Sequence, residues 1–198
     1  PSLGKSCYWP LVNRQAKPWR IHTRNGKPPR KKTAKICQTG KQQTARPKEH
    51  KMNWYPHVTV STIVEKDGLF LMVEENKHGR LLLNQPAGHL EKNESLFAAA
   101  IRETLEETQW RIELLGVLGN SLFTSPTNNT TYLRVSFVAR ALKQELALPL
   151  DTDIERAIWM SENEIRQQVS RLRSPMVIHD IERFNKGTIY PLELIQHL

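Results

Sequence analysis

Three glutamates stand at positions whose spacing places them on one side of a helix. Glu106 and Glu107 follow Glu103 by three and four residues, so at 100° per residue the three side chains fall within an arc of about 100°. Like charges at this spacing repel one another by about 0.2–0.5 kcal/mol per pair. A bound divalent cation removes that cost. Because every donor is a carboxylate oxygen, the cluster favours Mg²⁺ or Mn²⁺ over Zn²⁺.

The spacing of the residues that precede the cluster makes the pattern more specific. Arg102 stands four residues before Glu106, where a guanidinium can hold one carboxylate in place. Glu-rich helix faces are common on solvated surfaces, so the glutamates alone do not indicate a metal site. Gly88 and Glu94 extend them to the pattern Gly-x5-Glu-x7-Arg-Glu-x-x-Glu-Glu. At ordinary residue frequencies, these six matches arise by chance at roughly 10⁻⁵ per chain of this length.

With this pattern the chain resembles the Nudix family, the MutT-like hydrolases of nucleoside diphosphates linked to another group. The resemblance implies Mg²⁺- or Mn²⁺-dependent cleavage of phosphoanhydride bonds in small phosphorylated metabolites. A divalent ion neutralises anhydride oxygens and lowers the pKa of a bound water. We expect Glu103, Glu106 and Glu107 to bind the metal, and the resemblance adds the Gly88 carbonyl as a further ligand.

The general base has more than one candidate. We take Glu103 as the first choice, because reach to the attacking water is the primary requirement for a base. Family members differ in where the base lies, so Asp151, Asp153 and Glu155, near the next predicted strand, remain alternatives. Arg102 is expected to assist by orienting the carboxylates.

Two residues depart from the family pattern. Gln109 stands where the family has its closing Gly, and Thr104 occupies an apolar position after the Arg-Glu pair. The Gly ends the helix with a positive φ, a conformation that costs a non-Gly residue on the order of 1 kcal/mol. The substitution therefore puts the geometry of the helix exit in question, more than catalysis.

Segments outside the pattern narrow the resemblance to a group of bacterial phosphatases. They are residues 56–60, 84–91, 172–175 and 190–193. This similarity implies release of orthophosphate from hydroxymethylpyrimidine diphosphate, thiamine diphosphate and nucleoside di- or triphosphates. Two alternatives stand beside it: a pyrophosphohydrolase of dinucleoside polyphosphates or nucleotide sugars, and a non-catalytic Nudix-fold module that binds RNA.

Five further residues are candidate substrate contacts, each with a structural alternative. Arg134 could reach a phosphate from a strand or lie at the surface. Gln85 and His89 flank a predicted turn and could contact phosphate or base, or only close the turn. Arg173, at a helix start, could contribute to an anion site or lie beside an ordinary cap. Tyr190 could stack on a pyrimidine or pack in the core.

The central element that must position these groups is a helix over residues 94–108, with Asn93 as its N-cap. Ser161 followed by Glu164 forms a capping box that opens a short helix, and the Ser-Pro pair at 174–175 opens another that ends near Gly187.

Strands are expected around these helices. Alternating apolar residues predict a hairpin whose turn lies at 65–68. A short apolar run at 81–83 leads into a turn at 86–88. The expected strands are residues 58–64, 69–73, 112–118, 132–140 and 154–159. This order predicts one α/β (α+β) domain, a Nudix-type α/β/α sandwich with a mixed sheet.

Charge divides the chain into two parts. Residues 1–51 hold nine Lys and five Arg against one acid, a net charge of +13, and residues 52–198 carry −4. The front part also has six prolines and no Phe, so we expect it to be disordered. Two interpretations stand: a basic arm that binds nucleic acid, or non-native or upstream sequence before a natural start at Met52. We expect the Nudix domain to span residues 52–198.

Composition also bounds the setting of the protein. No stretch approaches the roughly 20 apolar residues of a membrane-spanning helix. Both cysteines, Cys7 and Cys37, lie in the basic front part, and their spacing supports neither a metal site nor a disulfide framework. We expect a cytoplasmic protein, as a monomer or homodimer, with no membrane partner and no nucleic-acid partner except through residues 1–51.

Overall fold

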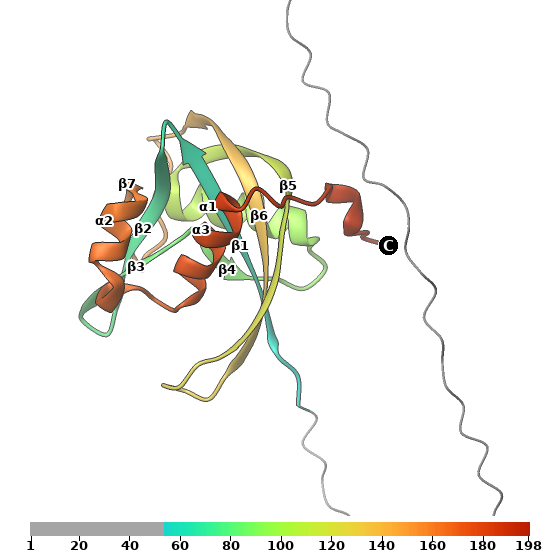
Figure 1. The fold of residues 1–198 in the computed structure, drawn as a ribbon, viewed down its shortest axis with the longest axis horizontal. Helices are drawn as coiled ribbons and strands as arrows, with labels where there is room; N and C mark the ends of the chain where they lie inside the picture. The colour runs from blue at the N-terminus through green and yellow to red at the C-terminus, as the bar shows by residue number, and fades with distance from the viewer. Residues whose placement is uncertain (1–53) are drawn as a thin grey trace, which may run out of the picture. The chain divides into compact units, whose positions relative to one another are not determined.

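The computed structural model describes residues 54–198 (Figure 1). The expectations for residues 1–51, including Cys7, Cys37 and a start at Met52, lie outside the described residues. The described chain forms β1 (His57–Lys66), β2 (Leu69–Lys77), β3 (Arg80–Asn84), β4 (Ala87–His89), α1 (Leu96–Thr108), β5 (Trp110–Thr124), β6 (Thr131–Gln144), β7 (Ile154–Ser161), α2 (Glu162–Gln167), η1 (Val169–Arg171), α3 (Met176–Asn185) and η2 (Leu192–Leu194).

The strands form one mixed sheet, as the sequence predicts. The path runs β3-β2-β1-β6-β5, with β4 paired to β1 and β7 paired to β2. β1 and β6 are parallel, in a register that runs from His57 opposite Tyr132 to Val64 opposite Ala139. The other pairings are antiparallel. β1 therefore has partners on both edges and lies in the middle of the sheet.

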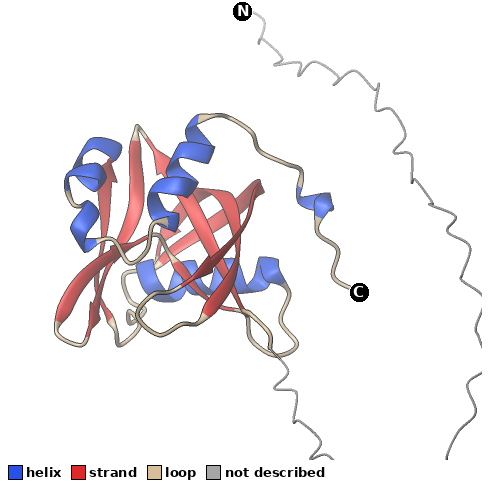
Figure 2. Cartoon of the chain, turned by 60° about the horizontal axis from the view of Figure 1, so that its bottom comes forward, coloured by secondary structure: helices blue, strands red, loops and turns tan. Residues whose placement is uncertain are grey.

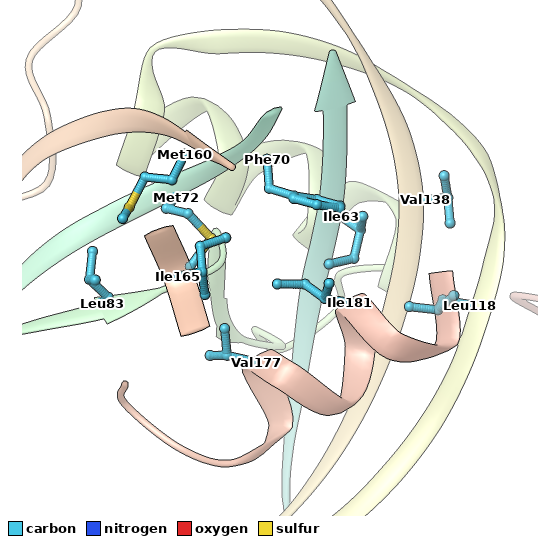
Figure 3. Close-up of a cluster of buried hydrophobic side chains, with 10 residues drawn as sticks. All are labelled: Ile63, Phe70, Met72, Leu83, Leu118, Val138, Met160, Ile165, Val177 and Ile181. Atoms are coloured by element: carbon cyan, nitrogen blue, oxygen red, sulfur yellow. The ribbon is translucent and has the colours of Figure 1, made fainter. Parts of the chain in front are cut away.

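Helices cover both faces of this central strand (Figure 2). On one face Val60 packs with Ala99 and Ala100 of α1. On the other face Ile63 packs with Val177 and Ile181 of α3, in the cluster drawn in Figure 3. Because both faces are covered, β1 is buried continuously from residue 59 to residue 64. The predicted α/β/α sandwich is confirmed. None of the helices within residues 54–198 is long and apolar enough to cross a membrane.

The start of α1 differs from the prediction. The N-cap is Ser95, whose Oγ accepts the Ala98 N–H at 3.1 Å. Asn93, the predicted cap, instead adopts a left-handed conformation with φ 66°. The helix begins two residues later than expected because Glu94 belongs to the preceding turn, where its carboxylate accepts the Glu91 N–H.

The turn predicted at 86–88 is also corrected in part. Residues Ala87–His89 form the short strand β4, which lies antiparallel to residues 59–61 of β1. Of the predicted turn, only Pro86 lies outside the strand, in a bend that precedes it. Three residues give too short an alternation to be recognised in a sequence, and pairing with β1 supplies the hydrogen bonds that stabilise this strand.

The end of α1 keeps the geometry of a glycine cap without a glycine. Gln109 is the C-cap with φ 62° and ψ 11°, and its N–H donates to the Leu105 carbonyl at 2.8 Å. Thr104 is fully buried, and its hydroxyl donates to the Ala100 carbonyl and lies 2.8 Å from the Thr62 hydroxyl of β1. A polar residue is accommodated at the apolar position because it is hydrogen-bonded.

Candidate active site

Two of the α1 glutamates line a pocket of about 340 Å³. Glu103 and Glu107 are each only 9% exposed, although both stand in an acidic cluster. The residues around the pocket come from β1, β2, β3, β4, β5, β6, the turn before β7, the segment before α3 and the start of α3. They include Thr59, Glu75, Asn84, Gly88, His89, Tyr132, Arg134, Asp151, Arg173 and Ser174.

Arg102 holds the acidic groups together. Its Nε donates to Glu94 at 2.8 Å, and one of its terminal nitrogens donates to Glu103 at 2.8 Å and to Glu106 at 3.0 Å. The other terminal nitrogen reaches the His89 carbonyl at 3.1 Å. The guanidinium therefore ties α1 to the turn before it and to β4. The hydrogen bonds of Glu94 are the largest cause of a raised Arg102 pKa.

Glu107 is joined to β4 by a hydrogen bond. Its Oε2 accepts the Ala87 N–H of β4 at 2.8 Å. Burial raises its pKa well above the ordinary glutamate value, against the effect of that hydrogen bond. Burial likewise raises the pKa of Glu103, which Arg102 only partly offsets. A cation in the pocket would remove this electrostatic penalty.

Gly88 lies directly against the carboxylate of Glu103. A Cβ atom at this position would stand 2.1 Å from Cδ and from Oε2 of Glu103. No side chain fits there while the carboxylate keeps its place. The close approach of the β4 backbone to the glutamate explains why a glycine is needed.

Carboxylate oxygens are suitable ligands for a divalent cation. The Glu106 side chain must rotate before all three glutamates can reach one ion. Among residues 54–198, no three Asp, Glu, His or Cys side chains converge on one point as they stand. Glu106 points to Arg102 and its side chain is 45% exposed. Since the three glutamates share one helix face, a rotation of the Glu106 side chain is enough to join it to the other two.

Arg134 of β6 lines the same pocket as these carboxylates. It is 5% exposed and not a surface arginine. One terminal nitrogen donates to Gln85 Oε1 at 3.2 Å, and its Nε has no hydrogen-bond partner among the described residues. Burial lowers the Arg134 pKa, and Asp180 is the largest opposing influence. Arg173 lines the same pocket and forms an ion pair with Glu75 at 3.2 Å.

Of the other predicted substrate contacts, His89 lines the pocket, whereas Gln85 and Tyr190 do not. His89 lines the pocket and lies edge to face with His57, at 5.6 Å between ring centroids. Gln85 is 1% exposed and lies behind Arg134 instead of at the wall. Tyr190 is 44% exposed and does not line the pocket, so it is neither in the site nor in the core. Its backbone pairs with Val117 of β5.

The candidate bases also differ in whether they line the pocket. Asp151 lines the pocket together with Glu103, and its N–H donates to the Glu106 carbonyl at 3.0 Å. Asp153 forms an ion pair with Lys77 at 2.5 Å and does not line the pocket. Glu155 does not line it either. Two of the four candidates therefore line the pocket.

Polar residues that the sequence analysis did not single out complete the pocket. Three of them have a buried oxygen without a hydrogen-bond partner among the described residues: Thr59 Oγ1, Asn84 Oδ1 and Ser174 Oγ. In the fourth, Glu75, Oε1 is paired only with the Arg173 guanidinium. Such groups are costly in a finished core, and here their residues line a cavity. They come from four separate elements, so no spacing in the sequence marks them. Thr59 belongs to the run 56–60, Asn84 to the run 84–91 and Ser174 to the Ser-Pro pair at 174–175, and Glu75 lies in no segment named from the sequence.

Comparisons with known proteins agree on one family. The model of the NUDIX domain matches residues 55–179. Phosphatase NudJ of Escherichia coli strain K12 is 41% identical over 140 residues, which cover 71% of this chain and 90% of that protein. NudJ of Shigella flexneri matches to the same extent.

A solved structure supports the same assignment. A NUDIX hydrolase from Nitrosomonas europaea superimposes with a TM-score of 0.72 and 41% identity, over 73% of this chain and 98% of that one. The MutT protein of Methanosarcina mazei, with a TM-score of 0.54 and 21% identity, has the same fold.

Proposed function

The chain belongs to the Nudix family of hydrolases, which cleave phosphoanhydride bonds and generally use divalent metal ions, and we propose that it is a Mg²⁺- or Mn²⁺-dependent phosphatase of small diphosphates. Its substrates would be hydroxymethylpyrimidine diphosphate, thiamine diphosphate and nucleoside di- or triphosphates, with orthophosphate as one product. The identity to NudJ, a phosphatase by name, supports this choice within the family.

The observation that carries the proposal is that carboxylates and arginines line the same pocket. Buried carboxylates of Glu103 and Glu107 come from α1, and the guanidinium groups of Arg134 and Arg173 come from β6 and from the segment before α3. A diphosphate with a divalent cation has the complementary pattern, since the cation suits the carboxylates and the free phosphate oxygens suit the arginines.

Each group has a role in this account. Glu103, Glu106, Glu107 and the Gly88 carbonyl would hold the cation, which when bound neutralises anhydride oxygens and lowers the pKa of water. Arg102 holds Glu103 in place and would release Glu106 when that side chain turns toward the cation. Arg134 and Arg173 would bind phosphate oxygens and orient the substrate.

The proton acceptor would be Glu103 or Asp151, because both line the pocket. His89 and Tyr132 form an aromatic side of the pocket, 6.2 Å apart between ring centroids, against which the organic part of the substrate can lie. Gln85 would act through Arg134 and not on the substrate.

The test is product analysis with the full chain and Mg²⁺, using thiamine diphosphate, a nucleoside diphosphate, a dinucleoside polyphosphate and a nucleotide sugar as substrates. Orthophosphate together with the monophosphate of the first two supports the phosphatase. Nucleoside monophosphate from the last two, without orthophosphate from the others, identifies a pyrophosphohydrolase instead. Turnover of none of the four would contradict the proposal and favour a binding module. A salt titration of RNA affinity with and without residues 1–51 then tests that module.

A further inference from the structure

A carboxylate that the proposed chemistry does not use lies behind the pocket. Asp180 of α3 is 0% exposed. Val177 and Ile181, on either side of it along α3, pack in the core and fix the helix (Figure 3). Ser136 Oγ donates to Asp180 Oδ2 at 2.7 Å, while Oδ1 has no hydrogen-bond partner among the described residues. A buried carboxylate of this kind is costly unless a cation compensates it.

Gln85 connects this anion to the pocket. Its Nε2 lies 3.5 Å from Asp180 Oδ2, and its Oε1 accepts from Arg134 at 3.2 Å. The side chain is 1% exposed, so neither contact competes with bulk water. Only this orientation of the amide turns its N–H toward the anion and its carbonyl toward the cation. The two charges therefore fix the orientation of Gln85, and Gln85 in turn fixes Arg134.

Arg134 is the end of this series that reaches the ligand. It lines the pocket, whereas Asp180 does not. Gln85 occupies one terminal nitrogen, and Nε is left without a partner among residues 54–198. A guanidinium buried without a compensating anion would be expected to turn away or to recruit one of the pocket carboxylates. Asp180 exerts the largest attraction on the guanidinium, ahead of Glu107 and Glu75, and no pocket carboxylate accepts a hydrogen bond from Arg134 among the described residues.

We propose that Asp180 is a positioning residue, which acts through Gln85 to hold the Arg134 guanidinium at the pocket wall for a phosphate group of the substrate. The proposal rests on the function given above, since it assumes a phosphate ligand. It assigns a role to a side chain that lies outside the pattern of residues 88–107 and does not line the pocket.

The experiment compares the full chain with its Asp180→Asn variant in saturating Mg²⁺. Asparagine has the same shape and still accepts from Ser136, but lacks the charge. Affinity for methylenediphosphonate, measured by calorimetry, should fall about tenfold, and KM for thiamine diphosphate should rise equally with kcat changed by less than about threefold. The matched control is Asp67→Asn in the exposed β1–β2 turn, where both values should stay as in the wild type.

A double-mutant cycle separates positioning from a merely structural role. In an Arg134→Gln background, Asp180→Asn should change the affinity by less than about twofold, because the residue it acts on is absent. Gln85→Leu should lower the affinity for methylenediphosphonate as Asp180→Asn does, although Asp180 is intact. If Asp180→Asn does not fold, the affinity of Gln85→Leu tests the proposal instead. Additive effects, an unchanged affinity in both single variants, or no binding of methylenediphosphonate by the wild type would overturn the proposal.

Failure of this inference is distinct from failure of the proposed function. A wild type that hydrolyses diphosphates, with Asp180→Asn and Gln85→Leu both binding normally, refutes the positioning role alone. A wild type that binds methylenediphosphonate through Arg134 and Asp180 but hydrolyses no diphosphate refutes the phosphatase and leaves the positioning role supported.

Discussion

At the scale of single residues, the site depends on a glycine that leaves room for a glutamate. The Glu103 carboxylate fills the space where a Gly88 side chain would begin. Arg102 and Ala87 hold Glu103 and Glu107 from opposite sides. The acids are thus placed by contacts with β4 as well as by the helix spacing.

Gly88→Ala should therefore reduce kcat by about 100-fold, since a displacement of Glu103 by about 1 Å misplaces a catalytic group. The β4 pairing remains possible for alanine, so the circular dichroism spectrum should be unchanged. Gly68→Ala in the β1–β2 turn is the matched control. Its φ of 80° makes the change costly in stability, about 1 kcal/mol, but nothing lies within 4 Å of the new Cβ and activity should persist. Equal kcat for Gly88→Ala and the wild type would refute this account of the site.

How well single site residues are predicted from the sequence depends on how local their signal is. The glutamates and Arg102 follow helix periodicity, and the structure places Glu103 and Glu107 at a pocket. Arg134 and Arg173 reach the same pocket from distant segments, which spacing alone could only suggest. Tyr190 lies elsewhere because an isolated aromatic residue near the end of the sequence carries no information on its neighbours.

At the scale of elements, α1 ends in a strained cap. Gln109 adopts a left-handed conformation that glycine adopts without steric cost. The sequence predicted this strain from the family pattern, whereas the N-cap was misplaced because Asn93 and Ser95 are both good caps and only the fold chooses between them. β4 was not predicted because its pairing with β1 is a tertiary interaction, which the local sequence does not show.

Gln109→Gly should raise the free energy of unfolding by up to about 1 kcal/mol, measured by urea denaturation, and leave kcat unchanged. Gln109→Ala is the control, because it removes the same side chain, with its hydrogen bond to the Leu148 carbonyl, and keeps the strain. The alanine variant should be no more stable than the wild type. If the alanine variant gains as much stability as the glycine variant, the strain is not the cause.

A buried carboxylate with two arginine partners joins β2, β7 and η1. Glu74 has a side chain 7% exposed and accepts from Arg156 and from Arg171, each at 2.6 Å. The hydrogen bond from Arg156 is the largest cause of its lowered pKa. A carboxyl whose pKa is lower in the folded state stabilises the fold above its ordinary pKa, near 4.5, and this contribution is lost as pH falls through the folded value.

Glu74→Gln should accordingly cost about 1–3 kcal/mol of unfolding free energy at pH 7, and the difference from the wild type should shrink as the pH falls below about 4. Urea denaturation at several pH values measures it. Glu113→Gln, which breaks only the exposed pair with Arg140, is the control and should cost less than about 0.5 kcal/mol. A deficit for Glu74→Gln that stays constant from pH 7 to pH 3 would exclude the charge as its cause.

At the scale of the whole molecule, the mixed sheet brings two kinds of charge to one pocket. Parallel pairing of β1 with β6 places Arg134 opposite Thr59, and the β1–β4 pairing places Gly88 opposite Val60. The order of elements predicts the sandwich, since strands, helix, strands and helices in this order leave few arrangements. It does not predict the buried series from Asp180 to Arg134, because its members come from β6, α3 and the loop after β3 and share no spacing.

The most direct test of the central claim is the rate of orthophosphate release from thiamine diphosphate by the full chain, its Glu107→Gln variant and the control Glu113→Gln, each with Mg²⁺ and with EDTA. We expect Mg²⁺-dependent release by the wild type and by the control, and a rate lower by at least about 100-fold for Glu107→Gln with its fold intact. Release that persists in EDTA, or in the Glu107→Gln variant, would contradict it.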